Sequence, residues 1–427
     1  MPVQERRGRF ARRGLLAGVL ARVLAGVRGA VTATVVVGAL VVGALVVGGT
    51  AATAGAAGAV PDGTAAGAGG PAGASAGGPA EGAGGPPLAD AADSPAADAD
   101  DVTPAASSST FPLADPDTVR ARDGRYVTYG TTVAAGRGKR CGATGRLFVP
   151  VLVHGSGNDV GMADCASADA LPGGPGSWAE PGGAVWAPGV ARFGDRFVMY
   201  YTASRKGSGQ KCIGRAVATS ARGPFTNAGE WACPPGGRWA IDANPFVSGG
   251  SLYVTYRDDA VASGAETGIS TVRTDARGRA VWDTRRTLLT STDITWDTAK
   301  SGSSTHVVEN PAMWRTPDGR WYLMYAGNNW DSARYATGIA DCGTTPLPNS
   351  RCTPLRQGVS RPYFGFTGAR GINPYRGLPG NHPGPGGMDV FAAADGSPRV
   401  VWHWWDGGTR HPVTGVLQRG TGGFSVR

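Results

Sequence analysis

One short strand-like phrase recurs five times in this chain, each time after a turn that contains Gly, alone or with Asp. The copies read RYVTYG, RFVMYY, SLYVTY, RWYLMY and RVVWHW, and they begin at Arg125, Arg196, Ser251, Arg320 and Arg399. β-Branched and aromatic residues directly after a tight turn are typical of the second strand of a β-hairpin. Because similar lengths of chain separate the copies, we expect one supersecondary unit that is repeated five times.

Such a repeat predicts an all-β fold, a five-bladed β-propeller whose blades each carry four strands. All twelve Trp and all eleven Tyr lie within residues 111–427, so we place the hydrophobic core and the propeller there. A propeller brings the first strand of every blade to one central axis. Residues that are far apart in the sequence can therefore meet in a single pocket.

The first 110 residues have a different composition. Residues 1–54 begin with an Arg-rich stretch, continue with an uncharged run from Ala30 to Gly48 and end in small residues. This order predicts a secretory signal peptide, although the run is also long enough for an uncleaved membrane anchor. Both alternatives place residues 111–427 outside the cytoplasm, so we expect a secreted protein or one anchored on the outer side of the membrane.

Residues 55–110 are almost wholly Ala, Gly, Pro, Ser, Thr and Asp, without any aromatic residue. A segment of this composition cannot bury enough apolar surface to offset its backbone entropy. We therefore predict a disordered linker between the export segment and the propeller.

The net charge of +9 is distributed unevenly. Residues 1–28 contribute +6 from seven Arg and one Glu, and residues 29–110 contribute −7 from seven acids, which leaves +10 for the remainder. The Arg residues of the remainder are scattered in ones and twos, and no nucleic-acid-binding module is recognisable. We interpret them as a solvated basic surface and expect no nucleic-acid partner.

The chain has six cysteines, an even number, and no CxxC or Cys/His cluster that would indicate zinc. In an exported protein this pattern predicts disulfides. Six cysteines allow several connectivities. We expect the sequential one, because each disulfide then lies within one blade: Cys141 with Cys165, Cys212 with Cys233, and Cys342 with Cys352.

Three acids stand at similar distances ahead of the hairpin turns. They are Asp115 in LADPDTVR, Asp242 in AIDANPFV and Glu309 in VVENPAMW. Each lies on or just before a strand that leads into the repeated phrase, and we expect the three to share one register in their blades. First strands line the axis of a propeller, so the three carboxylates should point at the same pocket.

Several further motifs occur in a fixed order along residues 111–427. They are the acid before Pro at Asp115, the WAP motif at Trp186-Ala187-Pro188, the acids Asp242 and Glu309, the segment Gly384-Pro385-Gly386, and His403 in VVWHWWD. This series resembles glycoside hydrolase family 43, five-bladed propeller enzymes that cleave arabinose- or xylose-containing polysaccharides.

The resemblance implies a role for each acid. Asp115 would be the general base that draws a proton from water, and Glu309 the general acid that protonates the leaving oxygen. Asp242 would orient Glu309 and raise its pKa by like-charge repulsion. Inverting glycosidases require two such carboxyl groups, one protonated and one ionised, with room for a water molecule between them.

Aromatic side chains are expected to form the sugar platform, with Trp186 and Trp330 as candidates. The resemblance adds Gly386 and His403 to the expected substrate-binding residues. Trp404 is expected in the blade core, because alternate residues of a strand point to opposite faces. Three other acids near the motifs are expected to cap turns or to face solvent: Asp117, Asp389 and Asp406.

The chain also departs from the family pattern. Gly189 stands where many relatives have Asp, Ala243 replaces a frequent Pro, and Asn310 separates Glu309 from its Pro. Gly387 stands where several relatives have His, which weakens the case for a metal there. We therefore expect no required cofactor, with a structural Ca²⁺ at the propeller axis as an open possibility.

The sequence thus predicts an exported glycoside hydrolase that acts on plant polysaccharide by single-displacement hydrolysis. Arabinan is favoured over xylan, because no β-sandwich follows the fifth copy of the phrase. We expect a monomer that meets the membrane only through its N-terminal segment. The alternative is a non-catalytic carbohydrate-binding propeller tethered at the cell envelope. A fructan-cleaving propeller is disfavoured, because this chain lacks the Asn-Asp-Pro and Glu-Cys motifs of such enzymes.

Overall fold

A computed structural model describes residues 107–133, 139–141, 143–157, 160, 165–297, 306–331, 334–355, 361–365, 385–406 and 408–426. These residues all fall in the second of two compact units, residues 81–427. The predicted export segment, nearly all of the predicted linker, and Gly384 lie outside the described residues. Within the described part, no helix has the length and apolar character needed to cross a membrane.

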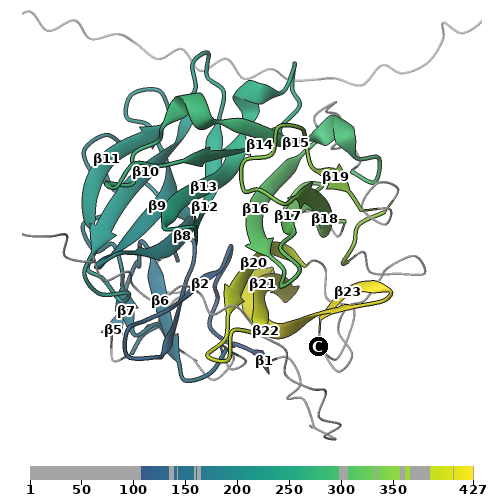
Figure 1. Ribbon diagram of the computed structural model, residues 1–427. Coiled ribbons are helices and arrows are strands. Elements are labelled where there is room, and N and C mark those ends of the chain that lie inside the picture. Colours follow the sequence, from purple (N-terminus) through teal and green to yellow (C-terminus); the bar gives the residue numbers. More distant parts are fainter. Residues whose placement is uncertain are drawn as a thin grey trace, which may run out of the picture. The chain divides into compact units, whose positions relative to one another are not determined.

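The described residues form five antiparallel sheets around a common axis, as the sequence repeat predicted (Figure 1). Blade 1 comprises β2 (Asp117–Arg120), β3 (Tyr126–Tyr129), β6 (Pro150–His154) and β7 (Ala168–Asp169). Blade 2 comprises β8 (Trp186–Phe193), β9 (Arg196–Ser204), β10 (Lys211–Ala218) and β11 (Thr226–Ala232). Blade 3 comprises β12 (Ala240–Ser248), β13 (Ser251–Asp258), β14 (Gly268–Arg273) and β15 (Arg286–Thr290).

Blade 4 comprises β16 (Val308–Arg315), β17 (Trp321–Gly327), β18 (Ala336–Gly343) and β19 (Thr353–Pro354). Blade 5 comprises β20 (Gly386–Ala392), β21 (Pro398–Asp406), β22 (Thr409–Gly420), β23 (Gly423–Val426) and the N-terminal β1 (Ser107–Ser108). A separate hairpin joins β4 (Lys139–Arg140) to β5 (Ala143–Thr144). The single-turn helices among the described residues are η2 (Asp259–Val261), η3 (Trp282–Thr284) and η4 (Ser291–Asp293).

The repeated phrase supplies the second strand of every blade, namely β3, β9, β13, β17 and β21. Its β-branched and aromatic residues suit this position because blades pack face to face, and a second strand is buried on both sides. In β17 every residue from Trp321 to Gly327 is buried. Gly124 and Gly319 precede two of these strands with φ near +82°, a conformation that glycine adopts without a steric penalty.

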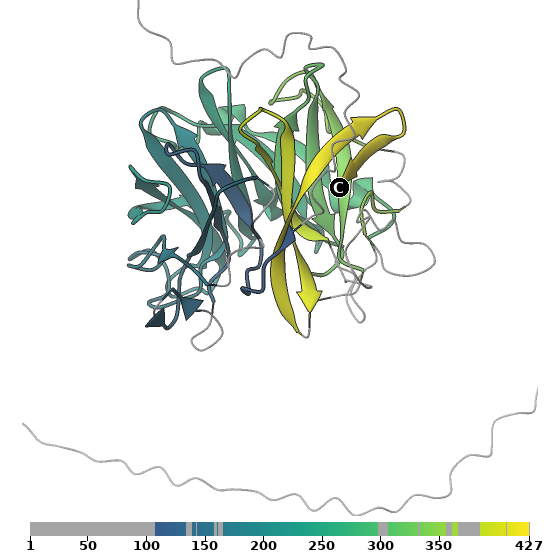
Figure 2. The same cartoon turned by 90° about the horizontal axis from the view of Figure 1, so that it is seen from below.

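The ring is closed by the segment that precedes blade 1. Strand β1 pairs antiparallel with β22, so the N-terminal end of the propeller becomes a strand of blade 5 (Figure 2). The backbone N–H of Leu113 continues this contact by donating to the carbonyl of Arg410. Phe111 and Leu113 are each only 1% exposed, so burial of their side chains fastens the closure.

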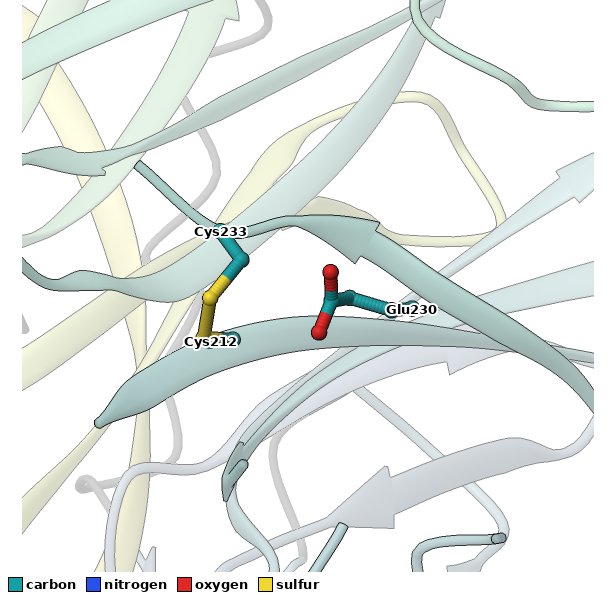
Figure 3. A group of neighbouring side chains, drawn as sticks. All are labelled: Cys212, Glu230 and Cys233. Carbon is teal, nitrogen blue, oxygen red and sulfur yellow. A yellow bond between two sulfur atoms is a disulfide. The ribbon is translucent and has the colours of Figure 1, made fainter. Parts of the chain in front are cut away.

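The three disulfides have the predicted connectivity. Cys212 on β10 joins Cys233 just after β11, so this bond ties two neighbouring strands of blade 2. Glu230 lies beside it (Figure 3). The two sulfur atoms are bonded to each other and provide no thiolate ligand, and the Glu230 carboxylate pairs with Arg205 at 3.1 Å. This group is therefore part of the blade structure.

Candidate active site

The first strand of each blade carries the same local distortion next to the axis. Pairing between the first and second strands is interrupted near the start of β8, β12, β16 and β20. One residue at each interruption, and one residue just before β2, has a positive φ of 39–57°: Asp115, Ala187, Asp242, Asn310 and Gly387. These five bulge positions are structurally equivalent, and each turns the chain toward the axis.

The bulges correct the expectation that the three acids share one register. Asp115 and Asp242 occupy equivalent bulge positions, but in blade 4 that position belongs to Asn310, and Glu309 comes one residue earlier. Successive residues of a strand point to opposite faces, so Glu309 reaches the site from a different direction. The amide of Asn310 connects the acids, because its backbone N–H donates to Oδ2 of Asp242 at 3.1 Å.

Asp115 has a side chain that is 12% exposed and surrounded by hydrogen-bond donors. Thr131 donates its hydroxyl to Oδ2 at 2.7 Å, and Nη1 of Arg410 donates to Oδ1 at 3.0 Å. The backbone N–H of Asp115 donates to Nδ1 of His403 at 3.1 Å. Burial alone would raise the pKa of Asp115, but the Arg410 cation and the Thr131 hydroxyl hold it below its ordinary value. This carboxyl group is therefore ionised at neutral pH.

Glu309 is 7% exposed, and both of its oxygens accept hydrogen bonds. Nη1 of Arg257 donates to Oε2 at 2.9 Å, and the hydroxyl of Tyr335 donates to Oε1 at 3.1 Å. Burial raises the pKa of Glu309, Arg257 opposes the rise, and the nearby charge of Asp115 adds to it. The net direction is upward, which is what a proton donor at neutral pH requires.

Asp242 lies beside Glu309 and titrates together with it. Burial raises the pKa of Asp242 well above its ordinary value, and the charges of Glu309 and Asp115 raise it further. Asp242 and Glu309 thus form a coupled pair of buried carboxyl groups that favours holding a proton.

A pocket opens on the propeller axis among the bulges. Its walls come from the first strands of all five blades and include Asp115, Asp242 and Asn310. Glu309 is set back behind Asn310 and does not line the pocket itself. Gly189 lines it in blade 2, and an added Cβ there would lie 2.1 Å from the carbonyl oxygen of Ala243. The close approach of blades 2 and 3 therefore leaves no space for a side chain at this position.

Asp117 and Asp389 do not cap turns or face solvent as expected. Both are buried at the axis, where Nδ2 of Asn244 lies 3.3 Å from Oδ2 of Asp117 and 2.9 Å from Oδ1 of Asp389. Their remaining oxygens accept backbone N–H groups of Val190 and Thr118. This trio lines the pocket and connects blades 1, 2, 3 and 5. The side chain of the third such acid, Asp406, lies outside the described residues.

The predicted substrate-binding residues have different positions. His403 is fully buried and stacks on Tyr335 at 5.9 Å between ring centroids. Burial first, and then Arg410, lowers the pKa of His403 to about 3, so its ring is neutral. Gly386 is buried behind the pocket, because an added Cβ would lie 1.8 Å from the ring of Tyr335. Both residues thus contact Tyr335, and neither lines the pocket.

The two tryptophans predicted to form a sugar platform, Trp186 and Trp330, are not among the residues that line the pocket. Trp186 precedes the bulge of blade 2, and Nζ of Lys211 lies 4.3 Å from its ring centroid. Trp330 is 45% exposed and stacks on Trp405 at 5.8 Å. Trp404 instead packs with the core between blades 4 and 5, as the strand alternation predicted.

Sequence reasoning missed four residues whose side chains touch the acids, namely Thr131, Arg257, Arg410 and Tyr335. Arg257 directly follows the repeated phrase of blade 3, a position near the axis that offered a weak signal. Arg410 and Tyr335 lie outside every recognised motif, and nothing in the sequence singled them out.

Comparison with known proteins settles the family. A model described as glycosyl hydrolases family 43 matches residues 110–353, more than half of the chain. The chain belongs to glycosyl hydrolase family 43. It is therefore a glycosidase, and the matched stretch contains Asp115, Asp242 and Glu309. The fifth blade, which carries His403 and Arg410, follows the matched stretch.

Individual family 43 relatives agree with this assignment. The probable arabinan endo-1,5-alpha-L-arabinosidase A of Aspergillus flavus is 27% identical over 271 residues, which is 59% of this chain and 76% of that protein. The Aspergillus oryzae protein of the same description gives the same figures. An alpha-L-arabinofuranosidase from Lactobacillus brevis has a TM-score of 0.54 at 19% identity, over 74% of this chain and 93% of its own.

A thermostable family-43 glycoside hydrolase has a TM-score of 0.53 at 22% identity, over 74% of this chain and 92% of its own. At these identities the two solved structures establish the shared propeller fold.

Proposed function

We propose that this glycosidase is an exported enzyme that hydrolyses arabinose-containing polysaccharide, with arabinan as the favoured substrate, by a single displacement. The observation that carries the mechanism is the opposite direction of two pKa shifts, one at Asp115 in the pocket wall and the other at Glu309, the neighbour of the pocket residue Asn310. The pKa of Asp115 is lowered by its cationic and hydroxyl partners, and that of Glu309 is raised by burial and by Asp115. Environments that separate two carboxyl groups in this way divide the base and acid roles between them.

In this mechanism Asp115 accepts a proton from a water molecule as the water oxygen bonds to the anomeric carbon. The bond from that carbon to the leaving oxygen breaks, and Glu309 transfers its proton to that oxygen. Asp115 ends protonated and Glu309 ionised, so one proton returns from Asp115 through solvent to Glu309 before the next turnover. Asp242 shares the proton of the coupled pair and holds Asn310, and through it Tyr335, in position.

Arabinan is favoured for two reasons. The two relatives with 27% identity are described as arabinan endo-1,5-alpha-L-arabinosidases. Trp186 adjoins the pocket residue Ala187, and Trp330 lies against Arg410, which donates to Asp115, so two flat rings that suit the apolar face of a sugar stand near the site. Export is supported by the three disulfides, which persist in oxidising compartments.

The group formed by Asp117, Asn244 and Asp389 at the axis does not fit a calcium ion. Ca²⁺ requires six to eight oxygen ligands. Each carboxylate oxygen of Asp117 and Asp389 already accepts an N–H group, and the NH₂ group of Asn244 occupies the position between the two carboxylates. We therefore propose hydrolysis by the carboxyl groups alone and expect a chelator to leave turnover unchanged.

The test is an assay of the purified protein on debranched arabinan, arabinoxylan, xylan and galactan, with identification of the released sugars. Glu309→Gln and Asp115→Asn should each lower turnover by about 10²–10⁴-fold. Asp395→Asn, which alters an exposed turn carboxylate, is the matched control. If the native protein binds arabinan saturably and releases no sugar, it is a carbohydrate-binding propeller and the proposal is wrong.

The stereochemical course needs a separate measurement. Proton NMR of the first product formed should show the anomer opposite to that of the substrate, because the water attacks from the face opposite the leaving group. First appearance of the same anomer would indicate a covalent intermediate and exclude a single displacement.

A further inference from the structure

Trp239 is an exposed tryptophan in blade 3, at the end of the blade where the candidate active site lies. It directly precedes β12, in which Ala240 pairs with Asp258 and Ile241 pairs with Arg257. Trp239 therefore extends the strand pair by one position at the end where Arg257 lies. Its side chain is 37% exposed, and the ring is not part of the hydrophobic core.

The backbone around Trp239 is fixed. Its carbonyl accepts the N–H of Asp259 at 3.0 Å. The preceding residue, Arg238, donates to the carbonyls of Asp259, Ala262 and Glu266 at 2.9–3.1 Å. An exposed ring on a backbone held in this way loses little conformational freedom when a ligand covers it.

Trp239 is also connected to the proton donor. The guanidinium carbon of Arg257 lies 5.7 Å from the Trp239 ring centroid, within the range of a cation–π contact. The same guanidinium donates to Glu309, and Asp259 holds it through two hydrogen bonds of 2.8 and 3.1 Å. One rigid, buried group therefore touches both the exposed ring and the acid.

The base has a comparable arrangement on its own side. Arg410 donates to Asp115, and its guanidinium carbon lies 5.0 Å from the ring centroid of exposed Trp330. Asp115 is thus linked through Arg410 to Trp330. Glu309 is linked in the same way through Arg257 to Trp239. The two rings belong to different blades, and each is associated with one side of the reaction.

From this arrangement we infer that Trp239 is the platform for the sugar on the leaving-group side of the bond that is cleaved. The inference rests on the proposed roles of Asp115 and Glu309. The proton donor must lie next to the leaving oxygen, so the sugar that carries this oxygen lies on the donor's side of the site. A pyranose or furanose ring presents an apolar face that can cover the indole and remove it from water.

The test compares Trp239→Ala with Trp239→Phe on linear arabinotetraose. Trp239→Ala should lower kcat/KM by about tenfold, through a higher KM, because the lost ring contact is of the order of 1.4 kcal/mol. Trp239→Phe should recover most of the loss, because a flat ring is restored. In the Asp115→Asn background, calorimetry should show about tenfold weaker tetrasaccharide binding when Trp239 is replaced by Ala.

Trp282→Ala is the matched control. Trp282 is 48% exposed and packs on Trp231, and it follows the end of β14 at which Arg273 pairs with Tyr253, away from Arg257. Native kinetics and native tetrasaccharide affinity in Trp239→Ala would overturn the inference while the hydrolase proposal stands. Failure of the native protein to release sugar would overturn the hydrolase proposal itself.

Discussion

Nη1 of Arg410 lies 3.0 Å from Oδ1 of Asp115, although 295 positions separate the two residues in the sequence. The contact crosses the seam where the ring closes, because Asp115 stands just before blade 1 and Arg410 lies on β22 of blade 5. Closure of the propeller and ionisation of the proposed base are therefore connected by one side chain.

The first prediction concerns this contact. In Arg410→Ala the pKa of Asp115 should rise, because the cation that opposes the effect of burial is removed. Protonated Asp115 cannot act as a base, so the acidic limb of the kcat/KM profile should move to higher pH. Arg410→Lys should shift the limb less, since it retains the charge. Arg419→Ala, which removes an exposed arginine paired with Asp318, should leave the profile in place.

The second prediction concerns the proton donor. The hydroxyl of Tyr335 donates to Glu309 and thereby lowers the pKa of that carboxyl group. Tyr335→Phe removes the donor, so the pKa of Glu309 should rise and the alkaline limb of the profile should move to higher pH. Measurement of kcat/KM between pH 5 and 9 for the native protein and for Tyr335→Phe tests this shift. A limb that stays in place, or moves to lower pH, would contradict the assignment of Glu309 as the acid.

The third prediction concerns stability and pH. Asp389 lies at the axis, where it accepts a hydrogen bond from the amide of Asn244. Burial raises the pKa of its carboxyl group to about 6. The folded state binds this proton more tightly than the unfolded state, so the contribution to stability is present at low pH and is lost as pH rises through about 6. The melting temperature of Asp389→Asn should therefore fall less than that of the native protein between pH 5 and 7. If the melting temperatures of the variant and the native protein change equally with pH, Asp389 is not the titrating group.

The fourth prediction concerns ring closure. Phe111 is 1% exposed and packs beside the segment that joins blade 5. Phe111→Ala should lower the free energy of unfolding by about 3–5 kcal/mol, because it leaves a cavity in a packed core. Thr110→Ala, at an exposed neighbouring position, should have little effect. Denaturant unfolding of both variants measures the difference, and a loss below about 1 kcal/mol would argue against this closure.

Much of the fold could be predicted because its signals are local. A turn glycine followed by alternating β-branched and aromatic residues specifies a hairpin without reference to the rest of the chain, and five copies specify the number of blades. The disulfide pairs were predictable for the same reason, since each closes within one blade. The three acids were recognisable because each precedes such a hairpin.

The tertiary structure alone decided how these parts meet. The bulges placed Asn310, and not Glu309, in register with Asp115 and Asp242, because a β-bulge shifts which residue faces the axis. Arg257, Tyr335 and Arg410 reach the acids from other strands, and the pairing of β1 with β22 joins the two ends of the propeller. Such contacts depend on the packing of distant segments, for which a sequence pattern of short period carries no information.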